Sequence, residues 1–216
     1  MKKNLTELVF ILDRSGSMSD LEKDTIGGYN SFVAKQQEAE GEANLTTVLF
    51  DDKYEILHDR ADIKNVQPLT GKEYFARGST ALLDAIGKTI IDIGKRIESM
   101  TEANRPAKVL FVITTDGHEN ASREFSAAKI KEMIEHQTSK YSWEFLFLGA
   151  NIDAVGTARD LGIREDCAVE FCCDSEGVEL NYEVMAEQVA LFRSSEKMKI
   201  ERDWKAKIEE DFEKRG

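Results

Sequence analysis

Five oxygen-bearing side chains in three separate segments have the right chemistry to bind a hard metal ion together. They are Asp13, Ser15, Ser17, Thr80 and Asp116. Their two carboxylates and three hydroxyls offer the oxygen ligands that suit Mg²⁺, Mn²⁺ and Ca²⁺. No cysteine accompanies them and their spacing requires no histidine, which argues against zinc. The glycines that follow Ser15 and Asp116 let the backbone turn sharply, so that the side chains can point inward.

The charge of this set suggests how a bound metal would be used. Two carboxylates bring a divalent cation near neutrality, and hydroxyls are weak ligands, so at least one coordination position keeps water. A carboxylate from another protein would replace that water with a stronger, direct bond. We therefore expect a divalent cation, Mg²⁺ ahead of Mn²⁺ or Ca²⁺, that captures an Asp or Glu of a protein partner. Taken alone, the segment from Asp13 to Ser17 is equally typical of a capped turn at a helix start.

Alternating apolar and amphipathic segments must position these side chains. Short apolar runs predict buried strands, and longer segments with helical periodicity predict helices between them. The expected strands span 5–12, 45–50, 54–63, 109–114, 143–148 and 168–171, and the expected helices 21–39, 80–100, 125–138 and 154–161. This order predicts an α/β three-layer sandwich whose central sheet is mostly parallel, with one antiparallel hairpin at an edge. The polar segments then meet at the carboxyl ends of the strands, where open parallel sheets bind ligands.

The complete set resembles the metal-ion-dependent adhesion site (MIDAS) of von Willebrand factor type A (VWA) domains. The resemblance spans roughly residues 5–171 and includes every position of the motif, in the family's order. It implies a Rossmann-like fold, with a metal held by Ser15, Ser17 and Thr80 and by Asp13 and Asp116, directly or through water. The chain is most similar to the intracellular bacterial or phage members, which often serve as adaptors, sometimes beside ATPases.

The last part of the chain differs in character from the rest. We expect a VWA domain over residues 1–175 and a C-terminal helical extension over 176–216. In the extension, an apolar residue recurs every fourth position, which predicts a narrow stripe on a helix. These residues are Ile200, Trp204, Ile208 and Phe212. We favour a stripe that covers the chain's own surface over one that docks on a partner or a second copy.

Composition narrows the class of protein further. The net charge of −12 disfavours nucleic-acid binding, and no local basic patch offsets it. No apolar run is long enough to cross a bilayer, and the first run ends too early for a signal peptide. Cys167, Cys172 and Cys173 show neither zinc-site spacing nor disulfide density, so we expect reduced thiols. These features predict a cytoplasmic protein that binds neither nucleic acid nor membrane.

Several polar residues near the motif have both a structural and a functional interpretation. Asp51 and Asp52 are expected to form a charged hairpin turn, rather than to add negative potential around the metal. Glu119 and Asn120 follow the motif aspartate closely and could line the rim of the site. Asp84 lies one helical turn after the motif threonine and either orients the loop or lies on the helix surface.

Two other functions compete with a binding module, which we expect not to be an enzyme. A metal-dependent phosphohydrolase with an aspartyl nucleophile would carry a second Asp where this chain has Ser15. Only His118 or Glu119 offers a general base for such a reaction. The third function is a structural component of a phage or cellular assembly, in which the metal only makes the loop rigid.

Overall fold

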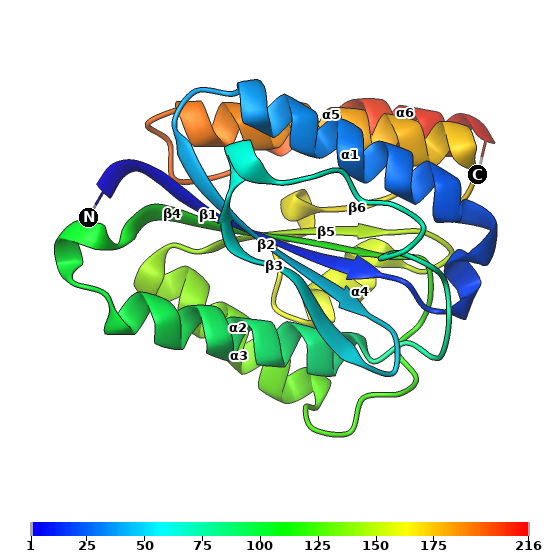
Figure 1. Ribbon diagram of the computed structural model, residues 1–216. Helices are drawn as coiled ribbons and strands as arrows, with labels where there is room; N and C mark the ends of the chain where they lie inside the picture. The colour runs from blue at the N-terminus through cyan, green and yellow to red at the C-terminus, as the bar shows by residue number, and fades with distance from the viewer. Residues whose placement is uncertain (1, 216) are drawn as a thin grey trace.

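The computed structural model describes residues 2–215, and it describes Lys3 by its backbone only. These residues form an α/β sandwich around one six-stranded sheet (Figure 1). The strands lie in the order β3-β2-β1-β4-β5-β6. Their bounds are β1 Lys2–Asp13, β2 Glu42–Phe50, β3 Tyr54–Asp62, β4 Pro106–Thr115, β5 Glu144–Gly149 and β6 Ala168–Glu170. All neighbours pair in parallel except β2 and β3, which are antiparallel. The predicted sheet and its edge hairpin are therefore confirmed.

The central strands are buried because helices cover both faces of the sheet. From Leu8 to Leu12, β1 is fully buried without alternation, as continuous apolar runs in parallel sheets are. Helices α1 (Glu22–Glu38), α5 (Ser175–Ser194) and α6 (Ala206–Arg215) lie on one face (Figure 1). Helices α2 (Leu82–Ser99) and α3 (Ala127–Tyr141) lie on the other, and α4 (Ala154–Asp160) contacts α3. Short 3₁₀ helices span Gly16–Leu21, Ile63–Asn65, Glu102–Asn104, Glu165–Cys167 and Arg202–Lys205.

Three of the expected helices begin one or two residues later in the structure, and α3 is one of them, since it begins at Ala127. The first turn after β1 is a 3₁₀ helix, so α1 begins at Glu22. The second expected helix begins at Leu82 rather than at Thr80, because Ala81 has non-helical backbone angles. Thr80 thus belongs to the loop and not to the helix, which leaves its side chain free to face a neighbouring segment.

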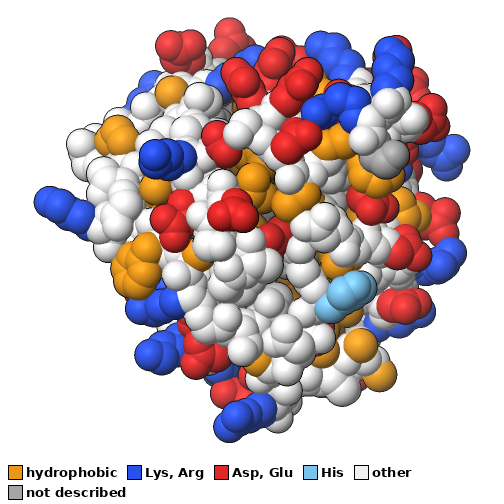
Figure 2. All heavy atoms as spheres, turned by 90° about the vertical axis from the view of Figure 1, so that its right-hand side faces the viewer, with side chains coloured by type: hydrophobic (Ala, Val, Ile, Leu, Met, Phe, Trp, Pro, Cys, Tyr) orange, Lys and Arg blue, Asp and Glu red, His pale blue; other side chains and the backbone are white. Residues whose placement is uncertain are grey.

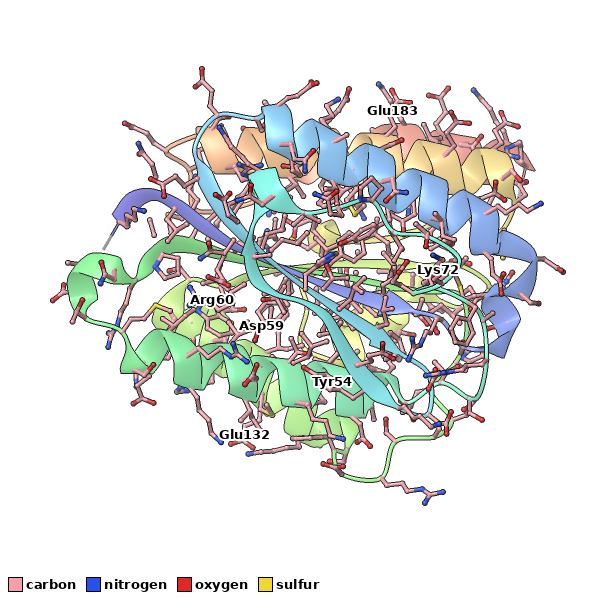
Figure 3. All side chains as sticks on the ribbon, in the orientation of Figure 1. Tyr54, Asp59, Arg60, Lys72, Glu132 and Glu183 are labelled. Carbon is pink, nitrogen blue, oxygen red and sulfur yellow. The ribbon has the colours of Figure 1, made fainter. Side chains whose placement is uncertain are left out.

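Ion pairs and hydrogen bonds anchor β3 at the edge of the sheet. Arg60, labelled in Figure 3, donates two hydrogen bonds of 2.9 and 2.8 Å to the fully buried carboxylate of Glu7 on β1. Tyr54 Oη lies 3.2 Å from Thr89 Oγ1 of α2, and Asp59 forms an ion pair with Arg96 of the same helix. These contacts fix the hairpin that flanks the carboxyl edge of the sheet.

The C-terminal segment packs on the body of the protein. The ring of Tyr182 on α5 stacks on Phe10 of β1, with centroids 6.3 Å apart. Ile200, Trp204 and Ile208 are buried, and Trp204 Nε1 donates to the carbonyl oxygen of Asp166 at 2.9 Å. The predicted cover of the chain's own surface is confirmed for these three residues, whereas Phe212 is half-buried.

The expectation of one continuous helix for this stripe is wrong. Ile200 precedes the last 3₁₀ helix, Trp204 lies within it, and α6 begins only at Ala206. Ile200 N donates to the buried carboxylate of Glu144 at 3.3 Å rather than to a helical carbonyl oxygen, so no helix runs through this position. The expected domain boundary falls next to Ser175, the first residue of α5, and it remains a prediction.

The composition predicts that no segment crosses a bilayer and that the cysteines are reduced thiols. Across residues 2–215, no helix combines the length and the apolar character that crossing a bilayer requires. The three cysteines are free thiols, of which Cys173 is exposed and the other two are buried.

Candidate metal-binding site

The predicted segments meet at the carboxyl edge of the sheet, at the ends of the adjacent strands β1 and β4. Ser15 Oγ lies 3.1 Å from Ser17 Oγ. Ser17 Oγ in turn donates to Asp116 Oδ1 at 2.5 Å, across 99 residues of sequence. The right-hand side of Figure 1 shows this edge, and Figure 2 looks directly onto it. Acidic side chains gather in the upper part of that view.

The loop before α2 brings Thr80 to the same place. A Cβ atom on Gly117 would lie 3.4 Å from Ser17 Oγ and 4.0 Å from Thr80 Oγ1, so this glycine lies against both hydroxyls. Gly16 N donates to the carbonyl oxygen of Gly78 at 3.2 Å, which ties the first segment to the second. All three predicted segments are therefore adjacent, as expected from the order of strands and helices in the sequence.

Asp13 is fully buried beneath these hydroxyls. Its Oδ1 accepts from Ser15 N at 2.7 Å and its Oδ2 from Thr115 Oγ1 at 2.6 Å. Burial raises the pKa of Asp13 to about 6, despite these hydrogen bonds. Burial also raises the pKa of Asp116. Within residues 2–215, neither carboxylate forms a salt bridge, so the site holds two desolvated acids without a cationic partner.

Arg14, which lies between the motif residues Asp13 and Ser15, pairs with acidic residues outside the motif. Arg14 is almost fully buried, and its Nε donates to Asp51 Oδ2 at 3.0 Å. Its other end reaches Glu55 Oε2 at 2.7 Å. Asp51 also accepts from Arg77 Nε at 2.7 Å. Burial acts to raise the pKa of Asp51, but these arginines outweigh it and hold that pKa below its usual value.

Asp51 is therefore a structural residue of the hairpin turn, as favoured from the sequence. Its Oδ1 accepts from Lys53 N at 2.7 Å, which closes the turn between β2 and β3. Its backbone carbonyl accepts from Ala81 N at 2.9 Å, directly after Thr80. The charge of Asp51 is compensated by arginines and contributes little negative potential to the metal site.

Asp84 and Glu119 organise the loop that follows Asp116. The carboxylate of Asp84 accepts from the backbone N–H groups of Arg123, Glu124 and Phe125 at 2.9 to 3.0 Å. Burial acts to raise the pKa of Asp84, and these donors outweigh it and lower the pKa. Glu119 accepts from Leu83 N at 3.0 Å, which joins the loop to the first turn of α2. Of the two interpretations of Asp84, the structure thus supports loop orientation.

Three further residues support the site, and the sequence alone predicts this role for none of them. Thr115 donates to Asp13, and Tyr74 Oη donates to the carbonyl oxygen of Asp13 at 2.6 Å. Asn120, expected at the rim, accepts from Thr80 N at 2.9 Å through its side-chain oxygen. Thr115 has a visible signal, as the last residue of a strand before the motif aspartate. Tyr74 lies in an irregular loop with no periodicity that could indicate its contact.

The donor set determines which ions the site suits. Among the residues that the structure describes, no three His, Cys, Asp or Glu side chains form a metal-binding cluster. A cation at this edge would therefore depend on the hydroxyls of Ser15, Ser17 and Thr80 beside the two carboxylates. Buried carboxylates without a countercharge are energetically costly, and a divalent cation supplies that charge. The residues present therefore fit a hard divalent ion.

Solved structures share this arrangement of sheet and helices. The vWF domain of the type V pili tip protein Mfa5 from Porphyromonas gingivalis superposes with a TM-score of 0.58 at 10% identity, covering 91% of this chain and 99% of that one. The protein has a VWA-like fold. A von Willebrand factor type A protein from Catenulispora acidiphila superposes with a TM-score of 0.55 at 16% identity, covering 88% of this chain and 43% of that one.

A third neighbour is the proximal thread matrix protein 1 from the mussel byssus, solved with a zinc-occupied MIDAS motif. It superposes with a TM-score of 0.59 at 15% identity, covering 87% of this chain and 46% of that one. The VWA-like chain spans less than half the length of several of these structures. No protein-family model matches the sequence. No curated protein matches it either.

Proposed function

We propose that this VWA-like chain is a protein-binding module that uses a divalent cation to capture a carboxylate of its partner. One observation carries the proposal. Two buried carboxylates, Asp13 and Asp116, meet three hydroxyls at the ligand-binding edge of the sheet, and neither carboxylate has a cationic partner within residues 2–215.

Each residue of the site has a distinct part in the proposal. Ser15, Ser17 and Thr80 hold the ion through their hydroxyls, while Asp13 and Asp116 balance its charge directly or through water. The bound cation supplies an open coordination position for an Asp or Glu of the partner. We propose Mg²⁺ as the ion, with Mn²⁺ and Ca²⁺ as alternatives of the same ligand preference. The zinc-occupied MIDAS of the mussel byssus protein supports binding of a divalent ion by such a motif.

The neighbours support adhesion or binding rather than catalysis. They include the tip protein of a pilus and a matrix protein of the byssus. In this chain, Ser15 occupies the position where an aspartyl phosphatase needs its second carboxylate, and His118 is exposed in a loop. We therefore propose a non-enzymatic adaptor of the cytoplasm, with a protein partner such as an ATPase-linked complex. We propose no role for it with nucleic acid or membranes.

Affinity purification with matched variants tests this function. The tagged chain, Asp13→Ala and Asp92→Ala are each incubated with native lysate in Mg²⁺ or in EDTA, and retained proteins are identified by mass spectrometry. Asp92 is the control because it lies half-exposed on α2 and pairs with Arg96 of the same helix. We expect proteins that wild type and Asp92→Ala retain only with Mg²⁺ and that Asp13→Ala does not retain. The same proteins recovered in equal yield from all samples would contradict the proposal.

A parallel screen separates binding from catalysis. The same three proteins are incubated with a panel of phosphate esters in Mg²⁺ or Mn²⁺. Binding alone predicts no turnover above buffer. Turnover that Asp13→Ala abolishes and Asp92→Ala retains would instead establish the phosphohydrolase alternative.

A further inference from the structure

A small, mainly apolar cavity lies beside Asp116, between the end of β4 and α5. Its volume is about 20 Å³. The cavity is lined by apolar side chains and by six polar residues, which are Thr25, Thr114, Thr115, Asp116, Asn181 and Tyr182. Figure 1 shows how α5 runs across the sheet face here, together with α1. Asp116 lines the cavity, but the hydroxyl residues of the metal-binding site, Ser15, Ser17 and Thr80, do not.

Several polar atoms at this cavity have no hydrogen-bond partner within the described chain. Across residues 2–215, five buried side-chain polar atoms have no hydrogen-bond partner. Four of them belong to three of the residues that line this cavity: Thr114 Oγ1, Asp116 Oδ2, Asn181 Nδ2 and Asn181 Oδ1. The Tyr182 hydroxyl lies near Thr114, but Thr114 Oγ1 forms no hydrogen bond of normal geometry. Unpartnered polar atoms are rare in protein interiors, so a cluster of four at one cavity points to a bound polar molecule.

Asn181 is the least expected member of the cluster. It lies on the sheet-facing side of α5 with only 1% of its surface exposed. An amide at such a position carries two donors and an acceptor into an apolar layer, and its burial is unfavourable unless hydrogen bonds compensate. No direct side-chain partner provides them within the described chain.

We propose that one internal water molecule occupies this cavity and joins Asn181 to Asp116. A buried water needs about 10–15 Å³ of such volume and two to four polar partners, and the cavity provides both. The Asn181 amide nitrogen donates to the water oxygen. The two water hydrogens are then donated to Asp116 Oδ2 and Thr114 Oγ1. Asn181 thereby becomes a positioning residue for a carboxylate of the metal-binding site.

The consequence for metal binding rests on the proposed function. Ser17 already holds Asp116 Oδ1, so a water on Oδ2 would fix the second oxygen and with it the plane of the carboxylate. Partners that orient a metal-binding carboxylate typically change metal affinity by about 10-fold or more when they are removed. We therefore expect the Asn181 side chain to affect Mg²⁺ affinity although it lies behind the metal-binding edge.

Crystallography at high resolution, with and without Mg²⁺, tests the water itself. We expect density within hydrogen-bonding distance of both Asn181 Nδ2 and Asp116 Oδ2 in either condition. A cavity without density, or one closed by a direct bond from Asn181 to Asp116, would overturn the proposal. The electron density of the water does not depend on metal binding. If the wild type failed to bind Mg²⁺, the proposed function would be refuted, but the presence or absence of this density would still test the water.

Calorimetric titration with Mg²⁺ tests the positioning role. Asn181→Leu keeps the shape of the side chain and removes its hydrogen bonds, and we expect about a 10-fold loss of Mg²⁺ affinity. Asn181→Ser keeps a polar group and leaves space for another water, so its affinity should stay within a few-fold of wild type. Gln188 is a buried amide of α5 that does not line the cavity, so Gln188→Leu serves as the control. Equal Mg²⁺ affinity of Asn181→Leu and wild type would refute the role, and circular dichroism verifies that each variant is folded.

Discussion

Burial and charge conflict most directly at Asp13. Its carboxylate is fully buried, accepts two hydrogen bonds and has no cationic partner among residues 2–215. The neighbouring Arg14, equally buried, avoids this conflict because Asp51 and Glu55 pair with it. Without a metal, Asp13 is therefore a source of instability at neutral pH, and a bound cation would remove it.

This conflict predicts the pH dependence of the metal-free protein. The pKa of Asp13 is raised by burial from 3.8 to about 6, so the folded state favours the protonated acid. The resulting stabilisation is fully present below about pH 4 and is lost as the pH rises through 6. Asp13→Asn removes this titration. In EDTA near pH 7, the free energy of unfolding of Asp13→Asn should therefore exceed that of wild type by up to roughly 3 kcal/mol.

Urea unfolding in EDTA at several pH values measures the difference between wild type and Asp13→Asn. The difference should be small near pH 4 and grow to its full size near pH 7. Asp20→Asn, which changes an exposed acid of the neighbouring 3₁₀ helix, should show no such trend. A stability difference between Asp13→Asn and wild type that does not vary with pH would contradict the assignment.

At the scale of elements, the site depends on loops that are held by side chains from neighbouring helices. Asp84 at the start of α2 binds three backbone N–H groups of the loop after β4. That loop carries Asn120, which accepts from the backbone of Thr80. The position of the motif threonine thus depends on a contact network between α2 and a loop far away in the sequence.

Replacing Asp84 tests this network. Asp84→Ala removes a charged acceptor from three backbone donors and should lower the free energy of unfolding by about 2 kcal/mol. It should also weaken Mg²⁺ binding by about 10-fold, because Thr80 loses its support. Asp92→Ala, two turns later on the same helix, should change stability by about 0.5 kcal/mol and leave Mg²⁺ affinity unchanged. Chemical denaturation and calorimetry measure both effects, and equal results for the two variants would refute the network.

The elements also show how far the sequence alone predicts this protein. Buried strands such as β1 and β4 are predictable because continuous apolar runs are typical of parallel sheets covered on both faces. The motif residues are predictable because their oxygen chemistry and their places after strands are both visible in the sequence. The contact of Tyr74 with Asp13 is not, because it depends on how an irregular loop folds back over the sheet edge. Asn181 is hidden for a similar reason, since helical periodicity does not indicate which polar atoms meet across α5 and β4.

At the scale of the whole molecule, the C-terminal segment completes the sandwich. Lys108 of β4 donates to the carbonyl oxygens of Phe192 and Ser195 at the C-terminal end of α5. Beyond this point, Ile200, Trp204 and Ile208 cover the region around β6 and the 3₁₀ helix before it. The apolar stripe therefore stabilises this chain, and the sequence pattern alone could not decide between this role and docking on a partner.

Truncation of the largest of these side chains tests that role. Trp204→Ala removes a buried indole and its hydrogen bond to Asp166, and should lower the free energy of unfolding by about 3 kcal/mol. Met198→Ala, in the same segment but 38% exposed, should change it by less than about 1 kcal/mol. Thermal or urea unfolding of the isolated chain measures the difference. Unchanged stability of Trp204→Ala would show that the stripe does not belong to the core of this protein.

The central claim is that the carboxyl edge of the sheet binds a divalent cation through its hydroxyls and acids. Isothermal titration of Mg²⁺ into wild type and into the double variant Ser15→Ala/Ser17→Ala tests it most directly. We predict binding to a single site in the wild type, with a higher melting temperature in Mg²⁺ than in EDTA. The double variant should bind Mg²⁺ at least about 10-fold more weakly than wild type, because two hydroxyl ligands are lost. Absence of Mg²⁺ binding by the wild type, or equal binding by the double variant, would contradict the claim.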